Sequence, residues 1–486
     1  MSPETTIVAA LVTPLIGAVG IALTGRLPNL RESVTLVTAG VLAVLVWSLV
    51  PQVMAGARPE LLVTTMLGGL SIAFEIEPLG MLFGALAASL WIVNSIYSIG
   101  YMRGNDEKHQ TRFYVCFAIA IFAALGVAFA GNLLTLFVFY EVLTISTYPL
   151  VSHKGDPATV RSARVYLGIL LSTSIGLLLP AMIWTYAEAG TLDFTAGGIL
   201  GDVAGPALGV LLGLYAFGIG KAALMPVHRW LPSAMVAPTP VSALLHAVAV
   251  VKAGVFTVLK VVVYVFGLDT LTEAGAQQWL VWVSGGTVVL ASLIAMTKDS
   301  LKARLAYSTV SQLSYIVLGA ALATASGVIG AAMHIATHAA GKITLFFCAG
   351  AIYTALHRTE VSELRGLGRT MPFTFAAFTV GAISIIGLPP FGGAWSKWFL
   401  TLGALEAGEL FAVAVLMVSS LLNIVYLLQI PLLAFFRAPA SGSVPEGVQE
   451  APLPCLIAIG ITSLLCVVLF FGADPLYELT RLLPSS

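Results

Sequence analysis

Long apolar stretches separated by short polar loops make up most of this 486-residue chain. A helix needs about 20 apolar residues to cross about 30 Å of hydrocarbon. Such stretches recur fourteen times, centred near residues 15, 42, 89, 121, 141, 174, 214, 253, 287, 313, 341, 387, 420 and 463. The pattern predicts an all-α polytopic membrane protein of about fourteen transmembrane helices, which we number spans one to fourteen.

Composition supports this interpretation. The chain is 58% hydrophobic and 9% charged, whereas soluble domains carry roughly 25% charged residues. Its 23 Lys and Arg balance its 23 Asp and Glu, so net charge does not point to nucleic acid. The four cysteines lack CxxC spacing, and no nucleotide, haem or iron–sulfur pattern occurs. We expect no cofactor, no metal and no catalytic residue, and therefore a transporter subunit in the lipid bilayer rather than an enzyme.

Basic residues fall in alternate loops, which predicts the orientation of the chain. Lys and Arg collect in short cytoplasmic loops. If the first loop is cytoplasmic, the opposite side holds only Arg58 and Arg481. The cytoplasmic loops then hold sixteen: Arg26, Arg31, Arg103, Lys108, Arg112, Lys154, Arg161, Arg164, Arg229, Lys298, Lys302, Arg304, Arg358, Arg365, Arg369 and Arg437. We expect a multi-pass protein of a bacterial cell membrane with both termini outside, a retained N-terminal helix and a flexible cytoplasmic loop at 437–452.

Two spans contain residues that break helices. Span seven runs "LGLYAFGIGKAALMP" into "VHRWLPSAMVAPTPVSALLHA", and span twelve holds "GLPPFGG" in its middle. Such backbone survives at membrane depth only where protein or a wet cavity surrounds it. Because the two spans are five apart, we predict two inverted five-helix repeats with broken helices 7 and 12. The expected units are three N-terminal helices (1–110), the repeats (111–266 and 267–436), and a loop with span fourteen (437–486).

Six charged residues lie within the predicted spans, where a charge costs roughly 2.5 to 3.5 kcal/mol on insertion scales. They are Glu141, Lys221, Lys252, Lys260, Lys342 and Lys397. We expect Glu141 to pair with Lys221 beside the break in span seven. The pair is either a switchable proton site or a structural ion pair that fixes helix packing.

The lysines of spans eight and twelve have different alternatives. Lys252 lies about midway along span eight and is expected to be functional. Lys260 lies farther toward the outer end, where its long stem could snorkel to the interface, and is expected to be structural. His246 precedes Lys252 by six residues, so it need not share its helix face, and it is either a relay group or a core histidine. Lys397 follows the break in span twelve between two tryptophans and is either a relay group or an interface anchor.

Span eleven contains "HIATHAAGK", which places His334, His338 and Lys342 on one helix face at i, i+4 and i+8. Titratable groups one turn apart suit a proton relay, because histidine changes charge near neutral pH. A zinc site would need a third ligand, which the sequence does not supply. A helix-packing role is the remaining alternative.

Several long motifs resemble the antiporter-like subunits shared by Mrp-type multisubunit sodium/proton antiporters, respiratory complex I and membrane-bound hydrogenases. They are "FYEVLTISTYPL", "GKAALMPVHRWLPSAMVAPTPVSALLHAVAVVKAGVF", "DSLKARLAYSTVSQLSYI", "ELRGLGRTMP" and "GLPPFGGAWSKW". The resemblance, from about residue 70 to 435, implies the fourteen-helix fold with two inverted repeats. It also implies a proton path through Glu141, Lys221, Lys252 and Lys397, with Lys342 and the span-eleven histidines between them.

Within this family, Lys397 and the histidine of "VSALLHA" resemble the D subunit of Mrp antiporters. The expected function is therefore a proton-translocating subunit of a monovalent cation (Na⁺)/proton antiporter, with other integral membrane subunits as partners. Two alternatives remain, a proton-pumping subunit of a complex I-like oxidoreductase or hydrogenase and a structural or assembly subunit that does not transport. Since the spans offer one carboxylate against five lysines, we expect any Na⁺ site to lie chiefly in a partner.

Overall fold

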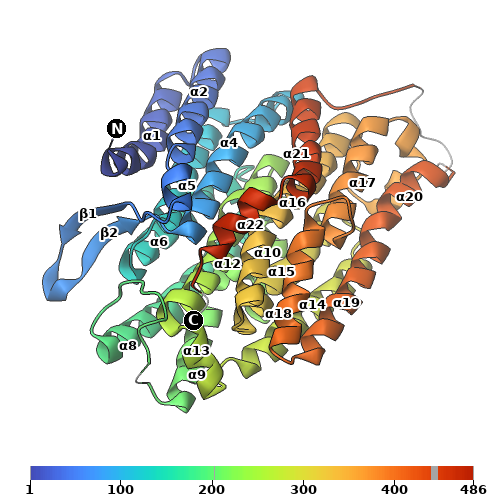
Figure 1. Cartoon of the computed structure of the whole chain (residues 1–486). Coiled ribbons are helices and arrows are strands. Elements are labelled where there is room, and N and C mark those ends of the chain that lie inside the picture. The colour runs from blue at the N-terminus through green and yellow to red at the C-terminus, as the bar shows by residue number, and fades with distance from the viewer. Residues whose placement is uncertain (1, 202, 439–446, 485–486) are drawn as a thin grey trace.

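The computed structural model is a bundle of helices with one small β-hairpin at its side (Figure 1). It describes residues 2–201, 203–438 and 447–484. The first half contains α1 Pro3–Leu23, α2 Pro28–Trp47, α3 Val50–Met54, β1 Glu60–Thr65, β2 Ser71–Glu75, α4 Pro78–Gly104, α5 Gln110–Ala128, α6 Leu133–Val151, α7 Pro157–Thr173, α8 Leu179–Ala189, α9 Gly205–Gly218, α10 Trp230–Ser233, α11 Thr239–Ala243 and α12 Val250–Val261. The second half contains α13 Leu268–Ala274, α14 Gln278–Thr297, α15 Leu301–Ala321, α16 Ala325–Leu356, α17 Pro372–Ile386, α18 Gly393–Glu406, α19 Leu410–Asn423, α20 Gln429–Phe436, α21 Leu453–Phe471 and α22 Asp474–Arg481.

The nearly all-α architecture confirms the predicted fold class. Each predicted apolar stretch has helix at or beside its centre. Among the described residues, eleven helical segments are long and apolar enough to cross a membrane individually, and α9 and α17 are shorter apolar helices. The exact count of fourteen spans therefore stays a prediction.

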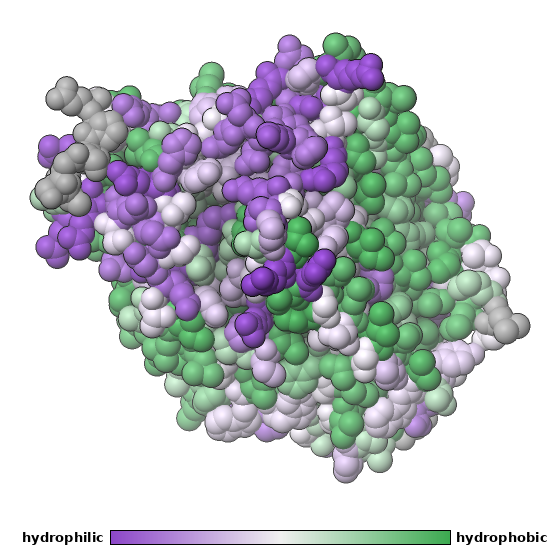
Figure 2. Space-filling model, turned by 180° about the vertical axis from the view of Figure 1, so that it is seen from behind, coloured by the Kyte–Doolittle hydropathy of each residue, from purple (hydrophilic) through white to green (hydrophobic). Residues whose placement is uncertain are grey.

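Apolar side chains cover the flanks of the bundle. Leu23, Phe436 and Phe471 are more than 70% exposed, at 82%, 79% and 73%. Figure 2 shows hydrophilic residues gathered over one end of the face in view, and hydrophobic residues over its flank. This distribution suits a molecule that is surrounded by lipid at its sides and by water at its ends.

The basic loops meet at one end of the bundle, which we call the arginine-rich end. Arg112 Nη2 donates a hydrogen bond to the carbonyl of His153 at 2.8 Å, and Leu301 N donates to the carbonyl of Thr359 at 2.9 Å. Lys154, Lys302 and Arg358, from three of these loops, line one cavity. The loop predicted at 437–452 follows α20, and its residues 439–446 lie outside the described part of the chain. The base of the hairpin lies at the other end of α5 from Arg112, and we call that end of the bundle the opposite end.

The hairpin was not predicted. Strands β1 and β2 pair antiparallel, with Glu60 opposite Glu75 and Thr65 opposite Ser71. Side chains along β1 are exposed on both faces except Leu61, so the segment lacks the apolar alternation that signals a half-buried strand. Two bonds anchor its base, from Glu75 N to the Phe129 carbonyl at 2.8 Å and from Gly131 N to the Ala73 carbonyl at 2.9 Å.

Both predicted helix breaks are present, and span eight is also irregular. In span seven, α9 ends at Gly218 and α10 begins only at Trp230. In span twelve, α17 ends at Ile386 and α18 begins at Gly393. Span eight changes from α11 to the π-helical turn Leu244–Val248 before α12 starts.

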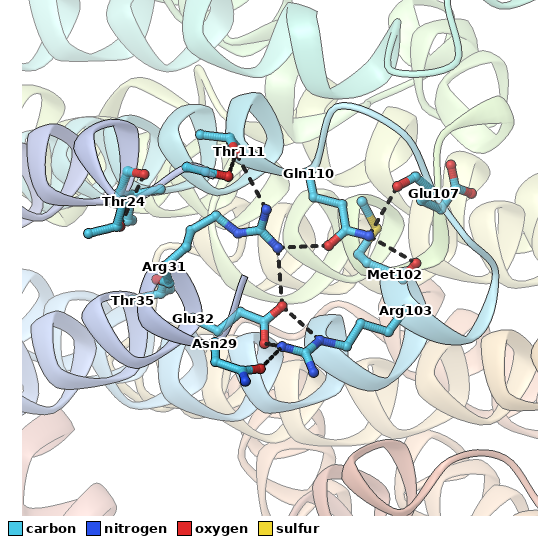
Figure 3. A network of polar contacts seen from close by, with 12 residues as sticks. Thr24, Asn29, Arg31, Glu32, Thr35, Met102, Arg103, Glu107, Gln110 and Thr111 are labelled. Carbon is cyan, nitrogen blue, oxygen red and sulfur yellow. Dashed lines mark hydrogen bonds and ion pairs between the residues drawn. The ribbon is translucent and has the colours of Figure 1, made fainter. Parts of the chain in front are cut away.

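A polar network ties the N-terminal helices to the rest of the bundle (Figure 3). Glu32 on α2 is 4% exposed and accepts from Arg31 at 3.1 Å and from Arg103 of α4 at 2.5 Å. Arg31 also donates to Gln110 of α5 at 2.8 Å and lies over the Tyr114 ring. Because both arginines depend on one buried carboxylate, Glu32 holds three helices together.

Replacing Glu32 by Gln should destabilise the protein by about 3 kcal/mol, because removing one partner of a buried ion pair leaves the other charge uncompensated. The measurement is thermal unfolding in detergent. Glu478→Gln is the matched control, since its pair with Arg481 is about half exposed and such pairs stabilise little. Equal effects of the two substitutions would contradict the assigned role of Glu32.

Candidate functional site

Lys221 lies where the backbone of span seven leaves the helix. It occupies the 3-10 turn Gly220–Ala222, and its ammonium is fully buried. Nζ donates to the Tyr140 carbonyl at 2.8 Å and to Thr144 Oγ1 at 2.6 Å, and it lies 3.1 Å from the centroid of the Tyr140 ring. The lysine is therefore held by oxygens and a π-face of α6.

The broken backbone around Lys221 finds its hydrogen bonds inside the protein. Trp230 Nε1 donates to the Gly220 carbonyl at 2.8 Å, and Lys221 N donates to Tyr140 Oη at 3.1 Å. Helix α12 packs directly on the break, since a Cβ on Gly254 would come within 2.3 Å of the Lys221 carbonyl carbon. This close approach brings α12, and with it Lys252, beside the break.

Glu141 does not form the direct ion pair with Lys221 that the sequence predicted. Among the ion pairs of the described residues, none joins the two. Lys221 turns to the carbonyl of the neighbouring residue, and both Glu141 carboxylate oxygens are buried without a hydrogen-bond partner in the described chain. The carboxylate still acts on Lys221 electrostatically.

Lys252 contacts a histidine of span eleven, which is the most direct contact between two of the predicted residues. Its Nζ lies 2.6 Å from His338 Nδ1, and both side chains are buried. The rings of His338 and His334 stack with centroids 5.7 Å apart. The predicted common face of α16 thus brings the two histidines together, and Lys252 reaches them from α12.

The histidine pair leads towards span twelve. His334 Nδ1 lies 2.9 Å from Ser396 Oγ on α18, and its ring stacks on Tyr315 with centroids 5.6 Å apart. Lys397 Nζ lies 4.8 Å from the centroid of the same Tyr315 ring. The groups Lys252, His338, His334, Tyr315 and Lys397 therefore form one continuous series from α12 to α18.

Lys397 is bound beside the second break by one backbone carbonyl and one serine hydroxyl. Nζ donates to the Ile386 carbonyl at 2.8 Å and to Ser420 Oγ at 3.1 Å. Its side chain is only partly buried, unlike Lys221, Lys252 and Lys342, which have no exposed surface. The two lysines share one feature. Lys221 lies over the ring of Tyr140 and Lys397 over the ring of Tyr315, and in each case the tyrosine comes from another helix.

Lys342 and His246 lie beside this series rather than in it. Lys342 Nζ donates to Ser308 Oγ at 2.6 Å and to the Leu305 carbonyl at 3.3 Å, both on α15. His246 packs on the Phe346 ring, and both its nitrogens are buried without a hydrogen-bond partner among the described residues. Lys252 and Lys342 both act on it electrostatically.

A cavity of about 220 Å³ lies at the arginine-rich end, beside the start of α11. Lys154, Thr239, Lys302 and Tyr353 are among its lining residues. Thr239 begins α11, and the chain continues through Ser242, whose buried hydroxyl has no partner within the described residues, to His246. Thr239, Ser242 and His246 therefore follow one another along the chain away from the cavity, and the last two are fully buried.

Near this cavity, two loop residues have altered acidities. Burial raises the pKa of Glu107, although Lys154 and Lys302 oppose that change. Burial also lowers the pKa of His153 to about 4, assisted by Arg112. His153 is therefore neutral at physiological pH, and its contact with Glu107 at 3.8 Å is not a charged pair there.

Sequence reasoning missed the neutral partners of the charged groups. Tyr140, Thr144, Ser308, Tyr315 and Ser396 hold the lysines and histidines. Hydroxyl residues are common in transmembrane helices, so their spacing alone carries no signal. No cluster of three or more His, Cys, Asp or Glu suited to a metal occurs among the described residues.

Comparisons with known proteins show that this chain and several membrane subunits belong to one family. Residues 130–423 match the family described as NADH:quinone oxidoreductase/Mrp antiporter, TM. The chain is 34% identical over 417 residues to the NADH-quinone oxidoreductase subunit N of Desulforudis audaxviator, covering 82% of this chain and 81% of that protein. It is 30% identical over 430 residues to the hydrogenase-4 component B of Escherichia coli, covering 83% and 63%.

The fold also matches a solved structure. A chain of the Mrp complex from Dietzia sp. DQ12-45-1b superposes with a TM-score of 0.88 at 23% identity, covering 99% of this chain and 97% of that one. Because the identity is low, this likeness bears on the fold alone.

Proposed function

Since the chain belongs to the NADH:quinone oxidoreductase/Mrp antiporter transmembrane family, we propose that it carries protons through its buried lysines and histidines. The observation that supports this most directly is the series Lys252, His338, His334, Tyr315 and Lys397. The contact of 2.6 Å between Lys252 and His338 joins two groups that each exist with or without a proton. A proton can therefore move between them without a large rearrangement.

The unpartnered polar atoms supply the remaining steps. Buried polar groups normally have a hydrogen-bond partner, in protein or in water. The carboxylate of Glu141 and the ring of His246 have none within the described chain. Waters at these positions would link Glu141 to Lys221 and the cavity at the arginine-rich end to His246.

Charge coupling passes the proton on. When one group gains a proton, its neighbours experience one more charge in a medium of low dielectric, and their affinity for protons falls. The proposed order is Glu141 and Lys221, then Lys252, then His338 and His334 of span eleven, and finally Lys397. Lys342, which lies beside the histidines on span eleven and is bound to α15, acts on this path through its charge. His246 delivers protons to Lys252 from the arginine-rich end.

The repeat of 111–266 and 267–436 remains a proposal. It is supported by the matching positions of Lys221 over Tyr140 and Lys397 over Tyr315. In each unit the lysine lies beside a broken helix, and the tyrosine comes from the helix two spans earlier. With one such lysine in each unit, the proton path would have two lysines beside broken helices at which it can take up or release a proton.

We propose that the parent complex is an Mrp-type cation/proton antiporter, in which this chain occupies the place of the D subunit. Its partners are then other integral membrane subunits in a bacterial cell membrane, with both chain ends on the outer side. The identity to a NADH-quinone oxidoreductase subunit favours a second candidate, a redox-driven pump with the same proton path. A subunit that serves assembly only would carry the cost of its buried lysines without a use for them.

Substitutions in the series should stop proton transport by the assembled complex. Glu141→Ala, Lys221→Ala and Lys252→Met each remove a proton carrier, and a positioned proton-transfer group typically contributes about 100-fold or more to a rate. The measurement is ΔpH formation in vesicles, with subunit content checked on native gels. Lys108→Gln, an exposed lysine at the arginine-rich end, is the control. Normal ΔpH in the assembled Lys252→Met complex would refute the proton path.

The chain should not carry sodium by itself. Hard cations prefer several oxygen ligands, and Glu141 is the one carboxylate within the predicted spans, against five lysines. We expect the isolated chain in liposomes to take up ²²Na⁺ no faster than empty liposomes. Saturable uptake would place a sodium site in this chain.

The subunits that co-purify in mild detergent should separate the two candidate complexes. We expect small hydrophobic companions, identified by mass spectrometry, with no flavin or iron–sulfur subunit. Recovery of redox subunits would instead assign the same proton path to an electron-transfer-driven pump.

A further inference from the structure

A second buried lysine lies on the same helix as Lys252 and makes a different kind of contact. Lys260 is 1% exposed, and its Nζ lies 3.2 Å from Glu77 Oε1 and donates to the Ala130 carbonyl at 2.8 Å. The sequence predicted a structural lysine whose stem could reach the outer interface. The stem does not snorkel, because Glu77, at the start of α4, meets the ammonium inside the protein.

Glu77 is fully occupied by hydrogen bonds. As the N-cap of α4, its carboxylate accepts from Leu79 N at 2.6 Å and from Gly80 N at 2.8 Å. Tyr264 Oη, in the π-helical turn Val262–Phe266, donates to Oε2 at 3.0 Å. Both carboxylate oxygens therefore have at least two donors each, counting Lys260.

This occupancy distinguishes the pair from the groups of the proton path. Glu141, His246 and His338 each retain a buried polar atom with no partner in the described chain, which leaves a position for water. Lys260 and Glu77 leave none. A fully bonded ion pair between packed elements stays in one state, because moving either group would leave the other unpaired at a cost of several kcal/mol.

Aromatic rings separate Lys260 from Lys252. The two lysines are eight residues apart on one helix, about 12 Å by the helical rise. Phe256 lies between them on the same face and packs on Phe83 with ring centroids 5.1 Å apart. The centroid of the Phe194 ring lies 4.5 Å from Nζ of Lys260, and that of the Phe256 ring lies 5.5 Å from it.

Several segments of the opposite end close around this pair. The loop 191–199 bonds to the π-helical turn, from Thr195 N to the Tyr264 carbonyl at 3.1 Å and from Ile199 N to the Val265 carbonyl at 2.8 Å. Figure 1 shows the hairpin, α8 and α13 gathered at the left and lower left of the molecule. Beyond Glu77, water reaches Arg58 and Glu75, whose side chains are 35% and 25% exposed.

We propose that the Lys260–Glu77 ion pair is a seal that closes the first half of the proton path at the opposite end. This inference rests on the proposed function. The pair and its rings block water between Lys252 and the exposed groups around Arg58. Protons that reach Lys252 then continue through His338 to Lys397, whose side chain is the partly exposed one of the four relay lysines.

The test is passive proton leak in liposomes that contain the whole complex, under a potassium-valinomycin potential and without a transported cation. We expect Glu77→Gln and Lys260→Met to raise the leak several-fold, because either leaves a buried partner that recruits water. Tyr264→Phe should raise it less, since it removes one hydroxyl. Tyr215→Phe is the matched control, because it removes a buried hydroxyl that contacts Thr185 at 2.8 Å.

Adding Lys252→Met to each leaky variant separates a seal from a damaged fold. A leak that uses the proton path should fall to the wild-type value, whereas a leak through a disordered bundle should persist and would overturn the proposal. If Glu77→Gln and Lys260→Met do not assemble, Tyr264→Phe decides in the same way. If Glu77→Gln or Lys260→Met assembles and leaks no more than the wild type, the proposed seal is also wrong. Unaffected transport in the Lys252→Met variant alone would instead overturn the proposed function.

Discussion

Charge buried among hydrocarbon-facing helices has to be stabilised by other parts of the same chain, and this constraint accounts for most of the features described above. Each lysine within the spans is met by groups from another helix. Lys221 is held by α6, Lys342 by α15 and Lys260 by the start of α4. Since water is not available in the hydrocarbon to replace these groups, the packing of the helices and the positions of the charges depend on each other.

The same constraint explains the broken helices. A helix interruption exposes carbonyls and N–H groups that must find partners. At the first break, Trp230 and Tyr140 satisfy the backbone around Lys221. At the second, the Ile386 carbonyl at the end of α17 accepts from Lys397 itself. The break thus supplies an acceptor for a charge, and the charge satisfies backbone that the break exposes.

Hydrogen-bond occupancy divides the buried ionisable groups into two kinds. Lys260 and Glu77 have all their partners within the protein and form a static pair. Glu141, His246 and His338 keep free polar atoms inside the described bundle. Groups of the second kind need water to complete their bonds, and a proton path needs the same water. Under the proposed function, groups of the two kinds would serve as a conductor and an insulator of protons, built from the same residue types.

The sequence by itself determined that the chain crosses a membrane repeatedly, that spans seven and twelve break, and that His334 and His338 share a face. These three features follow, in that order, from hydropathy, from the positions of proline and glycine, and from helical spacing. Each of these is a local property of the chain. Only the tertiary structure decided which groups meet. It put Lys252 against His338, turned Lys221 towards α6 rather than to Glu141, and drew Lys260 inward to Glu77. These contacts join residues between about 80 and 180 positions apart, and such pairings depend on how whole helices pack, which no local pattern records.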